Sequence, residues 1–162
     1  MAVTFIKEVE LAENHFYSNI NVKKLNDFAK LPTRGSEYAA GYDLYAATDK
    51  EIRIPPHSTN KIGTGLSFEL PVGTFAAIFA RSGIATKRHL RPANCVGICD
   101  SDYRGEYIIA LHNDSEVPQI IEPGERIAQM ILLPYISMNF NEVEELSDTK
   151  RGADGFGGSG RF

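Results

Sequence analysis

The sequence predicts an all-β protein, a β-sandwich or jelly-roll-like barrel built as one domain. Apolar and β-branched residues recur in short segments, and Gly, Pro, Asn or Asp interrupts them about every 8 to 12 residues. Helical periodicity is scarce along the 162 residues, and no internal repeat or Pro- or Ser-rich linker divides them. Many short strands with polar turns between them are typical of sandwiches and jelly rolls.

Five segments are expected to form strands. They are, in chain order, residues 66–70, 74–80, 107–112, 119–121 and 126–133. Residues 74–80 are continuously small or apolar, which suits a strand buried on both faces of a sheet. Pro134 closes the last strand, because proline cannot donate to a central ladder. One short helix is expected over residues 84–89, whereas residues 10–20 show no clear period and predict a loop or a brief helical insert.

The composition is that of an ordinary folded globule, with 43% hydrophobic and 23% charged residues. The net charge of −4 has the wrong sign for a protein that binds nucleic-acid backbone. The longest apolar run, residues 127–135, is too short to span a bilayer, and the first residues show no signal-peptide pattern. Cys95 and Cys99 are too few for a disulfide framework and are expected to be packed thiols. We therefore expect a cytoplasmic protein with no nucleic-acid or membrane partner.

The last residues differ from the rest, because half of residues 151–160 are glycine. Such a segment cannot bury enough surface to order itself, so one interpretation is a disordered tail. The other is an arm that orders over a ligand, with backbone amides for phosphate and Phe156 for stacking. On this second interpretation the chain divides into a single domain over residues 1–150 and a flexible arm over residues 151–162.

Residues 97–106, Gly-Ile-Cys-Asp-Ser-Asp-Tyr-Arg-Gly-Glu, carry the most informative polar pattern. Asp100 and Asp102 lie on one side of an extended chain, since strand side chains alternate faces. One interpretation is a polar hairpin in which the aspartates bond their own backbone. The other is a general base beside an anion site, with Tyr103 packed under a ligand ring.

Further polar residues fit an anion site. Asp43 lies amid small and apolar residues, where an unpaired carboxylate is costly. Arg81, Ser82 and Gly83 directly follow a buried strand, and their guanidinium, hydroxyl and backbone N–H groups are all donors to phosphate. Gln129 lies within an apolar strand and needs hydrogen-bond partners if it is buried. Together these residues outline an acid-and-arginine site for a phosphorylated ligand.

Five segments in chain order resemble the five motifs of the trimeric dUTPase family. They are residues 40–44, 81–83, 97–105, 124–129 and 151–160. The resemblance implies a jelly-roll-like distorted β-barrel that forms a homotrimer, with active sites at subunit interfaces. It also implies a dUTP diphosphatase that uses Mg²⁺ to hydrolyse dUTP to dUMP and pyrophosphate, which keeps uracil out of DNA and supplies dUMP for thymidylate synthesis. No residue of the chain is expected to be a direct ligand of the metal.

The resemblance also implies roles for the residues that handle the triphosphate. Asp100 resembles the base that activates water for in-line attack on the α-phosphorus, and Asp43 resembles its electrostatic partner in the metal shell. The phosphate-binding segment corresponds to Arg81, Ser82 and Gly83. Gln129 resembles the glutamine that holds the phosphate chain and a nearby water.

Other residues correspond to the nucleoside site and the arm. The hairpin that reads the uracil edge corresponds to residues 94–100, with Asn94 and Gly97 as substrate-binding residues. Tyr103 resembles the ring beneath the deoxyribose, where a 2′-hydroxyl would clash. The arm residues that close over the substrate correspond to Arg151 on the γ-phosphate, and to Phe156 and Gly157 at the uracil. In this arm Asp154 replaces a usual glycine and adds negative charge near the triphosphate.

Three other interpretations compete with this one. A dCTP deaminase shares the fold and parts of the motifs, but the Asp-x-Asp-Tyr-Arg-Gly stretch and the arm favour a hydrolase. A catalytically weak, nucleotide-sensing regulatory protein is a second alternative, and the presence of Asp100, Arg81 and Arg151 argues for catalysis. A purely structural jelly roll would leave the acids and Gln129 unexplained.

Overall fold

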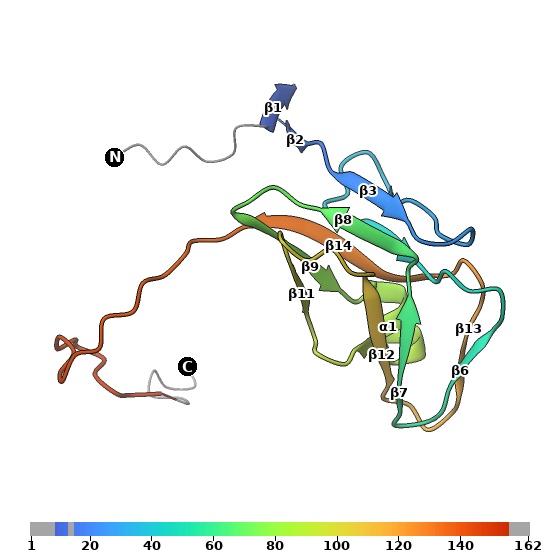
Figure 1. Ribbon diagram of the computed structural model, residues 1–162. Helices are drawn as coiled ribbons and strands as arrows, with labels where there is room; N and C mark the ends of the chain where they lie inside the picture. The colour runs from blue at the N-terminus through green and yellow to red at the C-terminus, as the bar shows by residue number, and fades with distance from the viewer. Residues whose placement is uncertain (1–8, 13–14, 156–162) are drawn as a thin grey trace.

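Strands dominate the computed structural model, which describes residues 9–12 and 15–155 (Figure 1). The strands are β1 (Val9–Ala12), β2 (His15–Ser18), β3 (Asn21–Lys24), β4 (Thr33–Arg34), β5 (Tyr42–Tyr45), β6 (Ile52–Ile54), β7 (Thr59–Gly63), β8 (Leu66–Glu69), β9 (Thr74–Phe79), β10 (Leu90–Pro92), β11 (Gly97–Asp100), β12 (Ile108–Asn113), β13 (Gln119–Ile121) and β14 (Arg126–Pro134). The helix α1 spans Ser82–Arg88. The predicted all-β class is confirmed.

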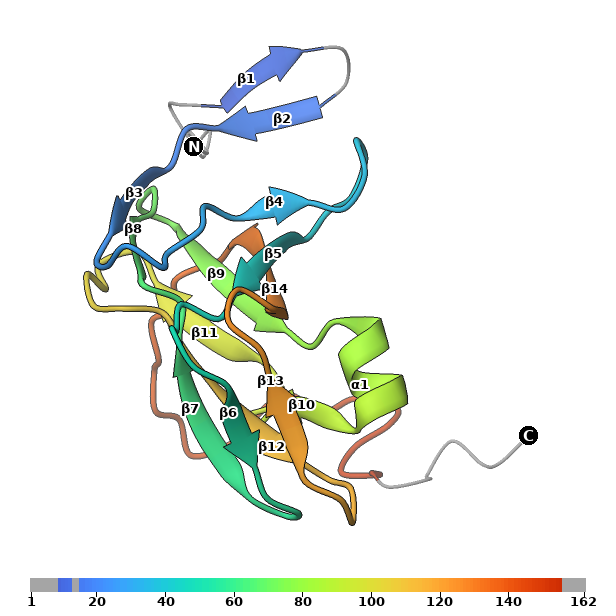
Figure 2. The same cartoon turned by 90° about the vertical axis from the view of Figure 1, so that its right-hand side faces the viewer.

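The described strands form five sheets. The largest has the order β11-β9-β14-β5-β4, a second has the order β10-β12-β7, and three pairs are β1-β2, β13-β6 and β3-β8. The two larger sheets and the β13-β6 pair surround the middle of the molecule in Figure 2. Within the described residues the hydrogen-bonded ladders do not close into a continuous barrel.

A single core joins the two larger sheets and the β13-β6 and β3-β8 pairs. Its fully buried apolar side chains come from strands of several sheets and include Leu44, Ile62, Leu66, Leu111, Ile121 and Ile127. The strand β12 alternates between exposed or half-buried and buried residues, as expected for a strand with one face on the core. By contrast, β9 buries residues on both faces, which its continuous apolar sequence predicted.

The five predicted strands are confirmed as β8, β9, β12, β13 and β14, with shifts of one residue at some ends. The helix predicted over residues 84–89 begins two residues earlier, because β9 stops at Phe79 and Arg81 takes the extended backbone of an N-cap. His89 ends the helix in the left-handed region, with φ of 54°.

The prediction for residues 10–20 is wrong. Instead of a loop or helical insert, β1 and β2 pair antiparallel, from Val9 opposite Ser18 to Ala12 opposite His15. Each strand has only four residues, which is too short for an alternating hydrophobic pattern to be recognised in the sequence.

After β14 the chain extends away from the sheets, as the orange-to-red segment of Figure 1 shows. Residues 136–155 contain no helix or strand. Ile136, Met138 and Phe140 are 80%, 71% and 86% exposed, so large apolar side chains recur at every second position along a segment that pairs with no strand of residues 9–12 or 15–155. No helix in the described part of the chain has the length and apolar character needed to cross a membrane.

Candidate active site

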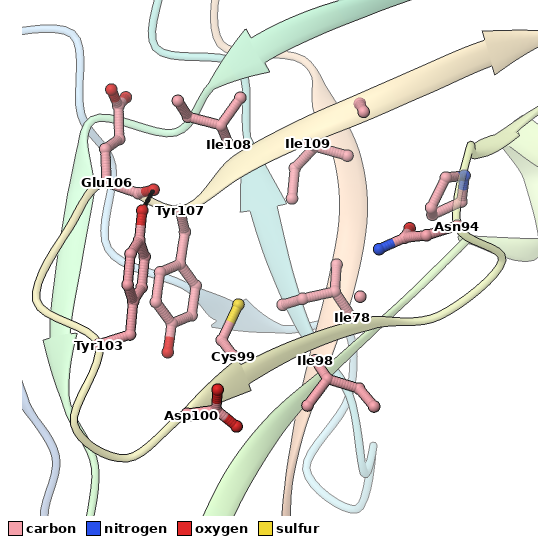
Figure 3. A pocket seen from close by; sticks show the side chains of 13 residues that line it. Ile78, Asn94, Ile98, Cys99, Asp100, Tyr103, Glu106, Tyr107, Ile108 and Ile109 are labelled. Carbon is pink, nitrogen blue, oxygen red and sulfur yellow. Dashed lines mark hydrogen bonds between the residues drawn. The ribbon is translucent and has the colours of Figure 1, made fainter.

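A pocket of about 300 Å³ lies beside β11 and the start of β12 (Figure 3). Four of the residues that line it were predicted from the sequence: Asn94, Gly97, Asp100 and Tyr103. The antiparallel pairing of β11 with β9 builds one wall and places Gly97 opposite Ile78. A Cβ at Gly97 would lie 3.1 Å from the Ile78 Cβ, so the missing side chain keeps this wall open.

Asp100 and Tyr103 stand at the rim of this pocket. Asp100 is the last residue of β11 and is exposed, so its carboxylate is accessible to a ligand. Tyr103 donates a 3.2 Å hydrogen bond from its hydroxyl to the Glu106 carbonyl, which folds the ring back over its own loop. A Cβ at Gly105 would lie 2.3 Å from the Tyr103 hydroxyl oxygen, so this ring position requires glycine there. The loop is fastened in turn by the Glu106 carboxylate, which accepts a 2.7 Å bond from the Gly65 N–H.

A second cluster surrounds Asp43, whose side chain is only 9% exposed. Its carboxylate accepts hydrogen bonds from Arg81 Nε at 2.6 Å and from Arg126 Nη1 at 3.1 Å. The two guanidinium groups supply the partners that a carboxylate in an apolar setting needs. Arg126 was missed as a candidate; the need of Asp43 for a counter-charge was the one signal in the sequence, and it did not specify which arginine would meet it.

Gln129 lies beside this cluster. Its side-chain amide donates a 2.9 Å bond to the Ala80 carbonyl, which confirms that the polar group in the apolar strand has a partner. A Cβ at Gly41 would lie 2.4 Å from Gln129 Oε1, so Gly41 leaves the room that this side chain occupies. The strand register explains why Gln129 lies beside the Asp43 cluster, because Gln129 on β14 is paired with Asp43 on β5 and with Phe79 on β9.

The phosphate-binding candidates emerge where β9 ends. Arg81 is the N-cap of α1, and Ser82 and Gly83 are the first residues of the helix and are exposed. A Cβ at Gly83 would meet nothing within 4 Å, so its backbone lies open to a ligand. The four residues Asp43, Arg81, Ser82 and Gln129 are thus brought to one region of the sheet.

Asp100 is not brought to that region within one chain. In the order β11-β9-β14-β5 it lies three strands from Asp43, and its partner Phe75 lies four residues from Phe79 along β9. With ordinary strand spacing and rise, this offset separates the two Cα atoms by about 20 Å. The expected partnership of Asp43 with Asp100 is therefore not made inside a single chain.

The arm is described only as far as residue 155. Arg151 is exposed, and its Nε donates a 2.9 Å bond to the Asp154 carbonyl. Phe156 and Gly157 lie outside the described residues.

The cysteines differ from the expectation of two packed thiols. Cys95 is exposed at the tip of the β10–β11 connection with φ of 61°, whereas Cys99 is half-buried in the pocket wall. Burial raises the pKa of the Cys99 thiol.

Across residues 9–12 and 15–155, no three His, Cys, Asp or Glu side chains are grouped to hold a metal ion.

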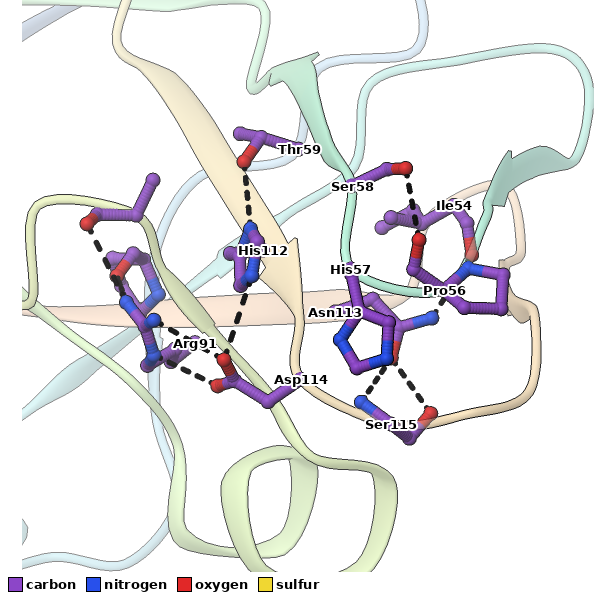
Figure 4. Close-up of polar contacts among 12 residues, drawn as sticks. Ile54, Pro56, His57, Ser58, Thr59, Arg91, His112, Asn113, Asp114 and Ser115 are labelled. Carbon is purple, nitrogen blue, oxygen red and sulfur yellow. Dashed lines mark hydrogen bonds and ion pairs between the residues drawn. The ribbon is translucent and has the colours of Figure 1, made fainter.

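A further polar group at the end of β12 belongs to neither cluster (Figure 4). Asp114 pairs with Arg91 at 2.8 Å and with His112 at 3.5 Å, and Thr59 meets the other ring nitrogen of His112 at 2.9 Å. The buried Asn113 donates to the carbonyls of Ile54 and Val117. These contacts tie β6, β7, β10 and the turn before β13 to the end of β12, so the group is structural.

Comparison with known proteins places the chain in a family. Residues 27–160 match the sequence model of the dUTPase family. A deoxyuridine 5′-triphosphate nucleotidohydrolase of Desulfitobacterium hafniense is 47% identical over 81% of this chain and 87% of its own length. Its counterpart in Nautilia profundicola is 44% identical over 88% and 99%.

The fold agrees with solved structures. A dUTPase of Staphylococcus bacteriophage 80alpha, solved with dUPNHPP, superimposes with a TM-score of 0.82 at 29% identity, over 89% of this chain and 99% of that one. The sequence match spans four-fifths or more of both partners in the two bacterial relatives. The family match over residues 27–160 includes the residues that build the pocket and the Asp43 cluster. The chain therefore belongs to the dUTPase family.

Proposed function

We propose that the protein is a dUTP diphosphatase that hydrolyses dUTP to dUMP and pyrophosphate. The observation that carries the proposal is the presence of two sites. One is the pocket beside β11, with the Asp100 carboxylate exposed at its rim, and the other is the Asp43 cluster with Arg81 and Arg126. The names of the relatives, deoxyuridine 5′-triphosphate nucleotidohydrolases, support the same activity. In the cell this reaction would keep uracil out of DNA and supply dUMP, and we place it in the cytoplasm.

The pocket beside β11 would take the deoxyuridine. Backbone N–H and C=O groups of residues 94–100 would pair with the uracil edge, and a site built on such bonds rejects a base with the wrong donor pattern by about 10⁴-fold. Asn94 and Gly97 line this part of the pocket. Tyr103 would pack against the deoxyribose, where a 2′-hydroxyl has no room.

The arginine-rich cluster would take the triphosphate. Arg81, Ser82 and Gly83 present a guanidinium, a hydroxyl and open backbone, and Gln129 lies beside them. Asp43 holds Arg81 in place through the 2.6 Å bond. Arg151 and the arm from residue 151 would close over the γ-phosphate, and Phe156 and Gly157 over the base.

In the chemical step, Asp100 accepts a proton from water as the water oxygen attacks the α-phosphorus. A new P–O bond forms, the bond to the α–β bridging oxygen breaks, and pyrophosphate leaves. When Mg²⁺ is bound, it neutralises phosphate charge.

The site would form between subunits of a homotrimer with a jelly-roll-like, distorted barrel in each subunit. The separation of about 20 Å between the Cα atoms of Asp100 and Asp43 within one chain supports this arrangement, because both residues are assigned to the same phosphate region of one substrate. Apolar side chains around the pocket also lie open in the isolated chain, with Ile98 66% and Ile108 50% exposed.

The test is pyrophosphate release from dUTP, dCTP, dTTP and UTP with Mg²⁺ present. We expect release from dUTP far above the other three. Conversion of dCTP to dUTP with loss of ammonia would instead identify a deaminase. Tight binding of a non-hydrolysable dUTP analogue without turnover of dUTP would identify a nucleotide-sensing protein.

A further inference from the structure

Three aromatic rings run from the rim of the pocket into the core. Tyr103 is 46% exposed, whereas Tyr107 and Phe68 are only 2% and 3% exposed. The rings of Tyr103 and Tyr107 stack with centroids 6.2 Å apart and planes 29° apart. Tyr107 in turn packs on Phe68 with centroids 4.5 Å apart. Tyr107 is thus the middle member of the column, and Figure 3 shows it directly beside Tyr103.

Tyr107 is fixed more firmly than its exposed neighbour. Its backbone N–H donates to Leu66 at 2.8 Å, and its carbonyl accepts bonds from the N–H and the hydroxyl of Thr64 at 3.1 and 2.7 Å. Tyr103 has one side-chain bond, from its hydroxyl to the Glu106 carbonyl three residues away in the same loop. The position of the Tyr103 ring therefore depends on the buried ring behind it.

The Tyr107 hydroxyl is buried, has no nitrogen or oxygen partner among the described residues, and lies beside the Cys99 thiol. Its ring edge faces Cys99 and the Asp100 side of the pocket (Figure 3). Burial, then the neighbouring Cys99 thiol, raises the pKa of Tyr107, so the group stays neutral. The ring, rather than the hydroxyl, makes the contacts that position Tyr103.

We propose that Tyr107 is a positioning residue that sets the preference for deoxyribose over ribose, by holding the Tyr103 ring where a 2′-hydroxyl would otherwise fit. This inference rests on the proposed function, in which Tyr103 meets the sugar. The Tyr103 ring can exclude a ribose 2′-hydroxyl only if it does not move, and close packing on buried rings restricts its movement. If the support behind Tyr103 is lost, the ring can retreat and UTP gains access.

The experiment compares kcat/KM for dUTP and for UTP in Tyr107→Leu and in the matched control Tyr107→Phe. Removing the ring should lower the dUTP-to-UTP ratio by about 10- to 100-fold, the effect of an ångström-scale misplacement. The phenylalanine variant keeps the ring and should keep the ratio within about threefold of the parent. A merely structural role would lower both substrates equally in Tyr107→Leu, and an unchanged ratio would overturn the proposal.

Two further variants keep the test decisive. Phe68→Leu loosens the same column from its buried end and should lower the ratio in the same direction; if Tyr107→Leu does not fold, this variant decides alone. In a Tyr103→Ala background, where the wall is gone, Tyr107→Leu should change the ratio no further. An additive change there would contradict the proposal. Failure of the proposed function is distinguishable, because the parent protein itself would then release no pyrophosphate from dUTP.

Discussion

The Nε of Arg81 donates a 2.6 Å hydrogen bond to Asp43, so one buried carboxylate sets the direction of the guanidinium that we assign to the triphosphate. Asp43 also binds Arg126, at 3.1 Å. The substitution Asp43→Ala leaves two arginines without their counter-charge and should lower the free energy of unfolding by about 2 kcal/mol, less than for a fully buried pair because Arg126 is half exposed. Urea denaturation measures the loss. Asp43→Asn should fall between this variant and the parent, and equal stability of all three would show that the ion pairs contribute nothing.

Asp100 is the proposed base, and its exposed carboxylate at the end of β11 is free to meet water. Asp100→Asn should lower turnover of dUTP by about 10²- to 10⁴-fold, because the amide cannot accept the proton. Binding of a non-hydrolysable dUTP analogue, measured by calorimetry, should be retained. The matched control is Asp102→Asn, an exposed acid two residues away in the same turn. Similar losses in both variants would point to general charge effects instead of a base.

Subunit sharing can be tested with two inactive variants. Asp100→Asn chains keep Arg81, and Arg81→Gln chains keep Asp100, so co-refolded mixtures can assemble intact sites from two different chains. Random trimers of an equal mixture should recover about a quarter of the sites. Mixtures that stay inactive would contradict shared sites, and a monomeric mass by light scattering would contradict the trimer itself.

The arm should matter for turnover and not for folding. Deleting residues 151–162 should leave the unfolding midpoint and the oligomeric state unchanged, because residues 151–155 are all exposed in the described structure. Turnover should fall by about a hundredfold or more, since an arginine that closes on a transferring phosphate contributes about 10³- to 10⁵-fold. A truncated protein with full activity would show that the segment is only a tail.

The negative charge of Asp154 allows a second test of arm closure. Its carboxylate would oppose closure over a triphosphate, so Asp154→Gly should tighten binding of the non-hydrolysable analogue, most clearly at low salt. Calorimetry at two salt concentrations measures the change. Equal or weaker affinity at low salt would mean that this carboxylate does not face the phosphates when the arm closes.

The two cysteines should react at different rates. Cys95 is exposed, whereas burial raises the pKa of the Cys99 thiol and keeps it protonated at neutral pH. Because the thiolate is the reactive form, an aromatic disulfide reagent should modify Cys95 first. Absorbance kinetics of Cys95→Ser and Cys99→Ser assign the two phases. The slow phase should slow further with the dUTP analogue bound, and an unprotected Cys99 would contradict ligand binding in the pocket.

Local patterns predicted the strands with a clear apolar signal, such as the alternating β8, the continuously small or apolar β9, and β14, which Pro134 closes. They did not predict β1 and β2, whose pairing joins two four-residue segments with little period of their own. The candidate residues could be picked out because buried polar groups need partners, and Asp43 and Gln129 have them.

Their mutual placement could not be predicted in the same way. Arg126 reaches Asp43 through a pairing of β14 with β5 whose register shifts between Arg126 and Ala128, and such an irregularity leaves no trace in local sequence. The distance between Asp100 and Asp43 depends on the order of strands in the sheet, which is a property of the whole chain. The support that Tyr107 gives Tyr103 likewise required the folded loop.

The apolar segment after β14 has a consequence for the lifetime of a newly made chain. Ile136, Met138 and Phe140 are exposed on an extended backbone, which is the form that proteases cleave and that aggregating strands add to. A solitary subunit would therefore be removed quickly, by degradation or by misassociation. In the proposed trimer a second subunit would cover this segment, so the amount of the protein in a cell would rise more steeply than its rate of synthesis.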